Sequence, residues 1–155
     1  MTILIKPEQM AESAKIGMDI RHKIHEEPEL GLCLHKTQEK ITKALASFSL
    51  NEVYEYVGGK DVTGVVAVIH GTKPGKTIGL RADSDALPLE EKTGAPWASQ
   101  VKGKMHACGH DGHVATLLTL CHYAAQHRDF AGTLIAIFQP GEEGFAGAKH
   151  MIADG

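Results

Sequence analysis

The sequence predicts an α/β protein in which a sheet is covered by helices on both faces, and two observations support this prediction. Continuous apolar runs of strand length alternate along the chain with longer segments whose apolar residues recur at helical spacing. The strand-length runs contain few interspersed polar residues, which is typical of strands buried on both faces. The 155 residues are enough for one domain with a substantial core but hardly for two.

Four helices are expected from the apolar periodicity and from the residues at the segment ends. The first begins at Pro7, which suits a first helical turn, and ends at Glu26 because Pro28 cannot continue a helix. The other three are expected at residues 37–48, 112–127 and 146–154.

Four strands are expected from short apolar runs that end at glycines or polar turns. They lie at residues 53–57, 64–69, 77–82 and 132–138, and the run at 77–82 is expected to be buried. Residues 83–104 are irregular and are expected to form a long loop. Long ordered loops in compact domains are often functional.

The composition is that of an ordinary globular protein and narrows the range of partners. Hydrophobic residues make up 43% and charged residues 23%, and the net charge of −3 gives no reason to expect nucleic acid or an anionic membrane as partner. No apolar stretch approaches a membrane span, and Ile3–Ile5 is too short for a signal-peptide core. The three cysteines have no paired spacing, so we expect a reducing, cytoplasmic location.

Three polar segments fall where α/β proteins bind ligands. Asp83 and Asp85 follow one expected strand, and Glu142 and Glu143 follow another. Between them in sequence, residues 105–113 (Met-His-Ala-Cys-Gly-His-Asp-Gly-His) lead into a helix. Because ligands bind beyond the carboxyl ends of strands in open α/β sheets, we expect these segments to form one site.

Residues 105–113 combine donor types that transition metals prefer. Cys108 and His110 are separated by one residue, so both can reach the same side of a turn, and thiolate with imidazole suits zinc or a similar metal. The alternative is a free cysteine beside a solvent-exposed histidine, which the nearby His106 and His113 disfavour. A structural zinc site is also disfavoured because the chain has no Cys-x-x-Cys pair.

The adjacent carboxylates can divide two tasks. One of Glu142 and Glu143 can coordinate a metal while the other acts as general base on water; the alternative is a solvated acidic turn. Asp83 can orient a ligand or coordinate directly, or it can be a cap or turn residue. The histidines outside the cluster, including His22 and His25, are expected to be surface or satisfied core residues.

Four blocks of the sequence together resemble the M20 metallopeptidase family, in particular its amidohydrolase branch of hippurate hydrolases, N-acyl-amino-acid hydrolases and indole-acetyl-amino-acid hydrolases. The blocks are residues 21–30, 80–88, 105–113 and 138–144, of which the Cys-Gly-His-Asp block is highly specific. The resemblance implies a three-layer α/β/α fold of the zinc-exopeptidase type. Residues 1–155 would be the N-terminal part of its catalytic domain, without the dimerisation or lid domain.

The resemblance also implies roles for individual residues. Cys108, His110 and Glu143 would be metal ligands, Glu142 the catalytic base, and Asp83 a supporting aspartate. The complete site would hold two divalent cations (Zn²⁺, Mn²⁺ or Co²⁺). It would hydrolyse the amide bond of a small-molecule N-acyl amino acid to a carboxylic acid and an amino acid. Two further histidine ligands would lie beyond this chain, and the full-length form would be a homo-oligomer.

Three alternatives remain open from the sequence. The chain could be a truncated, catalytically inactive fragment, because a two-metal site needs histidines that are not in it. Cys108 could instead be the nucleophile of a cysteine hydrolase, whose activity a metal chelator would not affect. A pure binding module is the third alternative, and the Glu142–Glu143 pair argues against it. Asp111 lies in the same block without an assigned role.

Overall fold

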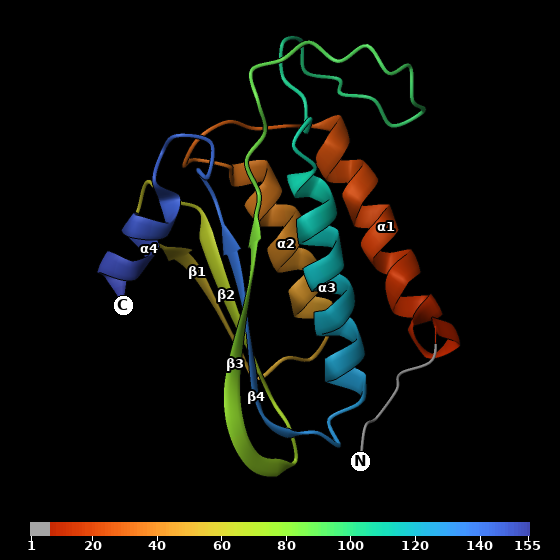
Figure 1. The fold of residues 1–155 in the computed structure, drawn as a ribbon, viewed down its shortest axis with the longest axis vertical. Coiled ribbons are helices and arrows are strands. Elements are labelled where there is room, and N and C mark those ends of the chain that lie inside the picture. Colours follow the sequence, from red (N-terminus) through yellow and green to blue (C-terminus); the bar gives the residue numbers. More distant parts are fainter. Residues whose placement is uncertain (1–6) are drawn as a thin grey trace.

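In the computed structural model, residues 7–155 are described, and they form three layers with a mixed sheet in the middle (Figure 1). A 3-10 turn at Pro7–Met10 leads into helix α1, and α1, α2 and α3 cover one face of the sheet while α4 lies on the other. The expected α/β/α architecture is therefore confirmed. None of the helices in residues 7–155 is both long enough and apolar enough to cross a membrane. The helices are α1 (Ala11–Glu26), α2 (His35–Ser47), α3 (His110–Gln126) and α4 (Gly147–Asp154).

The sheet brings the ends of two distant strands to one edge. Its strands are β1 (Glu52–Val57), β2 (Gly64–His70), β3 (Lys73–Asp83) and β4 (Ala131–Gln139), in the order β1-β2-β4-β3. β2 is antiparallel to both β1 and β4, whereas β3 and β4 are parallel. Asp83 lies opposite Gln139 in the parallel pair, so the carboxyl ends of β3 and β4 are neighbours.

The expected helices and strands are present, and the largest difference concerns β3. This strand begins at Lys73, where it pairs with Ala131 across a register shift, rather than at Thr77. The prediction that residues 77–82 are buried is wrong, because Ile78 is 60% exposed and Leu80 is 41% exposed. The reason is that β3 is an edge strand in the described part of the chain, with β4 as its neighbour on one side.

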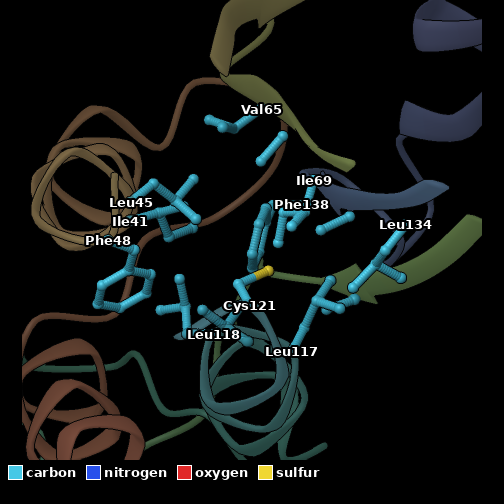
Figure 2. Close-up of a cluster of buried hydrophobic side chains, with 14 of the residues drawn as sticks. Ile41, Leu45, Phe48, Val65, Ile69, Leu117, Leu118, Cys121, Leu134 and Phe138 are labelled. Atoms are coloured by element: carbon cyan, nitrogen blue, oxygen red, sulfur yellow. The ribbon is translucent and has the colours of Figure 1, made fainter. Parts of the chain in front are cut away.

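The core lies between the sheet and helices α2 and α3 (Figure 2). Leu45 of α2 and Leu118 of α3 are completely buried, and Phe138 of β4 is almost so. Burying one side chain of this size stabilises the fold by about 1.5–3 kcal/mol. The sulfur of Cys121 points into the same cluster, and burial raises the pKa of this thiol to about 12. Cys121 is therefore a core residue that stays protonated.

Helix α1 packs closely along α3 in the antiparallel direction (Figure 1). A Cβ added at Gly17 would lie 2.1 Å from Thr119 Oγ1, so the glycine permits the close approach. At the start of α1, Ser13 Oγ lies 2.8 Å from Nδ1 of the buried His122, near the end of α3. The antiparallel arrangement consequently places the C-terminal end of α1 beside the N-terminal end of α3.

Candidate metal centre

Two connections meet at the edge of the sheet where β3 and β4 end. Residues 84–109 form the long loop that joins β3 to α3, and residues 140–146 form the short turn that joins β4 to α4. The parallel pairing of β3 with β4 brings these connections together although they are distant in sequence. In open α/β sheets this edge is the usual position of a ligand site.

Three chemically different donors converge at this edge. The Sγ of Cys108, a ring nitrogen of His110 and a carboxylate oxygen of Glu143 all lie within 4.8 Å of one another. His110 is buried, whereas Cys108 is exposed and the side chain of Glu143 is partly exposed. Thiolate, imidazole and carboxylate are the donors that bind Zn²⁺ and related cations. The residues present therefore fit a divalent cation, both in their chemistry and in their proximity.

The ring of His110 is oriented by a backbone contact. Its Nδ1 lies 2.8 Å from the carbonyl oxygen of Asp85. Because a carbonyl oxygen can only accept, Nδ1 donates this hydrogen bond, and Nε2 is the ring nitrogen that faces the carboxylates. Nε2 lies 3.9 Å from a carboxylate oxygen of Glu142 and 3.9 Å from one of Glu143. A metal-binding histidine is normally oriented by a hydrogen bond from its other ring nitrogen to a carbonyl or carboxylate oxygen, and the bond from Nδ1 to Asp85 is of this kind.

The carboxylate of Asp85 holds the acidic pair beside His110. Its two oxygens accept hydrogen bonds from the backbone N–H groups of Glu142, at 2.9 Å, and Glu143, at 3.0 Å. Asp85 is only 1% exposed, so one buried side chain links the loop after β3 to the turn after β4. The sequence marked Asp85 only as a carboxylate after a strand; its linking role depends on contacts across the sheet edge.

Asp83 also lies close to His110. Its Oδ1 is 3.6 Å from His110 Nε2 and 2.6 Å from His113 Nδ1, and its Oδ2 is 3.2 Å from Arg81. Burial opposes ionisation of Asp83, but the hydrogen bond from His113 and the nearby His110 and Arg81 keep its pKa below the usual value. Asp83, His110 and His113 form a second group whose donor atoms lie within 4.8 Å, and the sequence had suggested no role for His113.

The thiol of Cys108 is protonated when no cation is bound. It donates a hydrogen bond to Glu143, and this contact is the largest cause of its raised pKa. Burial and the carboxylates of Glu143, Glu142 and Asp83 shift the pKa in the same direction. Binding of a cation to the sulfur must therefore displace a proton.

A buried polar cluster lies beside residues 105–113, which carry the candidate ligands Cys108 and His110. Asp111 Oδ2 accepts hydrogen bonds from Arg21 Nε, at 3.0 Å, and from His25 Nδ1, at 2.9 Å. His25 is thus a satisfied, buried histidine, as expected, but the sequence could not show that its partner is Asp111. The nearby His106 is buried as well, and burial lowers its pKa to about 4, so this ring is neutral at pH 7.

The turn that carries Glu142 and Glu143 is closed by a tight contact at Gly147, the first residue of α4. The Gly147 N–H donates to the carbonyl oxygen of Gly141 at 3.0 Å. A Cβ added at Gly147 would lie 1.7 Å from the carbonyl oxygen of Pro140. A side chain at this position therefore forces the turn to move.

We expect Gly147→Ala to destabilise the protein by about 1–3 kcal/mol, the usual cost of inserting a methyl group where there is no space. The measurement is the melting temperature by circular dichroism. Gly79→Ala is the matched control, because a Cβ at Gly79 would meet only Ile137 Cδ1, at 3.9 Å. An unchanged melting temperature for Gly147→Ala would contradict the contact.

Known proteins are similar in sequence to the part of this chain that contains the site. The profile of Peptidase family M20/M25/M40 matches residues 79–155. The hippurate hydrolase of Campylobacter jejuni is 50% identical over 136 residues, which cover 88% of this chain and 34% of that protein. Thermostable carboxypeptidase 1 of Saccharolobus solfataricus is 48% identical over 141 residues, which cover 89% of this chain and 35% of that protein.

A solved structure agrees in fold as well as in sequence. The Bacillus subtilis YXEP protein, described as a dinuclear metal binding peptidase from the M20 family, superposes with a TM-score of 0.85 at 39% identity, over 92% of this chain and 39% of that one. The fold is therefore the one that this M20 peptidase has over the matching region. The chain belongs to the peptidase family M20/M25/M40. It spans about a third of the length of the curated relatives named above.

Proposed function

We propose that this chain is the metal-binding part of an enzyme that hydrolyses the amide bond of N-acyl amino acids, such as hippurate, to a carboxylic acid and an amino acid. The convergence of Cys108, His110 and Glu143, with Glu142 beside them, carries the proposal. The 50% identity to a hippurate hydrolase supports the substrate class. Residues 1–155 correspond in this proposal to the N-terminal part of the catalytic domain of a longer, homo-oligomeric enzyme.

Cys108, His110 and Glu143 hold the cation in this proposal, and the other ligands come from the remainder of the enzyme. Divalent cations, two in the complete site and of the type Zn²⁺, Mn²⁺ or Co²⁺, supply Lewis acidity and lower the pKa of water. His110 serves through Nε2, because its Nδ1 is engaged by the carbonyl oxygen of Asp85.

Glu142 is the general base in this proposal. Its side chain is 43% exposed, so the carboxylate can accept a proton from water and return it to the departing amine. The backbone N–H groups of Glu142 and Glu143 both donate to Asp85, which fixes the backbone of the two residues. In this proposal the fixed backbone allows one side chain to act as base and the other as ligand. Asp83 supports the site by restraining the rings of His110 and His113.

The environment of Cys108 favours a ligand over a nucleophile. A nucleophilic cysteine needs a base and a lowered pKa. The thiol of Cys108 instead donates to the carboxylate of Glu143, and its pKa is raised. A better supported alternative than a cysteine nucleophile is that the chain alone binds a cation but does not turn over substrate. The chain covers only 34% of the hippurate hydrolase, which favours this alternative.

A chimera tests the proposal, in which this chain replaces the matching segment of the Campylobacter jejuni hippurate hydrolase. We expect the chimera to hydrolyse hippurate, to lose the activity in a chelator, and to regain it with Zn²⁺, Mn²⁺ or Co²⁺. Chelator-resistant hydrolysis would instead identify Cys108 as a nucleophile. A chimera that binds metal but releases no glycine from hippurate would contradict the substrate class. The 155-residue chain, assayed in parallel, shows whether it is active alone.

A further inference from the structure

Residues 105–113, which carry Cys108 and His110, are attached to helix α1 through side chains that have no part in the catalytic roles proposed above. The C-terminal end of α1 lies next to the N-terminal end of α3, and the long loop of residues 84–109 extends over both (Figure 1). Cys108 is the penultimate residue of this loop, and His110 begins α3. The contacts of α1 with this region therefore bear directly on where the two donors lie.

Asp111 is the centre of these contacts. It follows His110 directly and is 0% exposed. Its Oδ2 accepts hydrogen bonds from Arg21 Nε and His25 Nδ1, both of α1. Its Oδ1 has no hydrogen-bond partner within residues 7–155. A buried carboxylate is costly without partners, so the two donors from α1 determine where Asp111 can stay.

His25 extends the contact into the long loop. Its Nε2 lies 3.3 Å from an oxygen of Glu91, and the other oxygen of Glu91 accepts the backbone N–H of Ser99 at 2.6 Å. The single imidazole of His25 therefore joins the start of α3 to the middle of the loop. Glu91 precedes Cys108 in the chain and Asp111 follows it, so movement of the His25 ring would change contacts on both sides of Cys108.

Two further contacts seat the loop on the same end of α1. The ring of His22 stacks on Trp97, with ring centroids 4.0 Å apart and an angle of 10° between the planes. The backbone N–H of Gln100 donates to the carbonyl oxygen of Glu26 at 2.8 Å. The loop is therefore attached to α1 by contacts of its own. The contacts of Asp111, in the first turn of α3, are the ones nearest to Cys108 and His110 in sequence.

We propose that Asp111, held by Arg21 and His25, is a positioning residue that fixes Cys108 and His110 for cation binding. The inference rests on the proposed function only in taking these two residues as ligands. Asp111 donates nothing to the cation itself. The hydrogen bonds of Asp111 to Arg21 and His25 fix the position of the first turn of α3. Without the Asp111 carboxylate, Cys108 and His110 are still present but are no longer held in position for the cation.

Cobalt titration of the 155-residue chain tests this role, followed by the thiolate-to-cobalt charge-transfer absorption. We expect Asp111→Asn and His25→Ala to weaken cobalt binding by about 10–100-fold, the usual effect of removing a partner behind a ligand. The absorption band should return at saturating cobalt, because Cys108 is still present. His25→Asn should restore most of the affinity, because the asparagine amide N–H can replace the Nδ1–H of histidine.

Ser13→Ala is the matched control. It removes another buried side-chain contact between α1 and α3, the one to His122, at the opposite end of the helices. We expect it to lower the melting temperature and leave cobalt affinity unchanged. Equal cobalt affinity for the wild type, Asp111→Asn and His25→Ala would overturn the positioning role while leaving the metal centre intact. An equal loss in Ser13→Ala and His25→Ala would overturn it too, since general destabilisation would then be the cause. A wild-type chain without the charge-transfer band would refute the ligand assignment of Cys108 in the proposed function.

Discussion

Cys108→Ser should reduce the zinc and cobalt affinity of the chain by on the order of 100-fold or more, since losing a partner behind a ligand already costs about 10–100-fold. A serine hydroxyl does not ionise at neutral pH, so the variant replaces a soft, charged donor with a neutral one. Elemental analysis after dialysis measures the loss directly, and the thiolate-to-cobalt absorption should disappear.

Cys33→Ser provides the comparison for this variant. Cys33 is also exposed, but its sulfur donates to the carbonyl oxygen of Asp61, away from the donor cluster. We expect its metal content to match that of the wild type. Undiminished metal in Cys108→Ser would remove Cys108 from the ligand set.

Glu142→Gln in the chimera with the hippurate hydrolase should lower turnover by about 10²–10⁴-fold, which is the usual contribution of a general base. Glutamine keeps the size of the side chain and the backbone N–H that binds Asp85, but its amide cannot take a proton from water. Metal content should therefore stay at the wild-type level. Steady-state kinetics with hippurate and elemental analysis of the same samples give both values.

The variant Glu143→Gln distinguishes the role of Glu143 from that of Glu142. Its oxygen belongs to the donor group with Cys108 and His110, so this variant should lose metal and, as a consequence, activity. Full turnover by Glu142→Gln would refute its assignment as base. Retention of metal by Glu143→Gln would mean that the two glutamates do not divide the tasks as proposed.

The meeting of the polar segments could be predicted from the sequence because it depends on local patterns. Buried-type runs end directly before Asp83 and shortly before Glu142, and Cys108 precedes a helical apolar pattern. Strands that are parallel end at the same edge, so locating the strands was enough to bring the three segments together.

The supports of the site could not be predicted, because each joins residues far apart in the chain. Asp85 looks like Asp83 in the sequence, and only the hydrogen bonds to Glu142 and Glu143 distinguish their surroundings. His25 has an ordinary helical context, and its link to Asp111 arises from the antiparallel packing of α1 on α3. The periodicity of a sequence shows which face of a helix is apolar but not which helix covers it.

The wrong prediction for β3 has a related cause. A continuous apolar run predicts that both faces of a strand are covered, provided that other elements lie on each side. In residues 7–155, β3 has β4 on one side, and Ile78 and Leu80 remain exposed. The apolar character of this run was identified correctly, whereas its burial depends on neighbours that a local pattern does not specify.

The outer edge of β3 limits the concentration at which this protein stays monomeric. The Ile78 and Leu80 side chains stand beside main-chain groups that have no adjoining strand in the described region. Such an edge recruits extended segments from other molecules. Concentrated samples are therefore expected to self-associate reversibly and then precipitate. Ion titrations should be run dilute, with light scattering to verify that particle size stays constant.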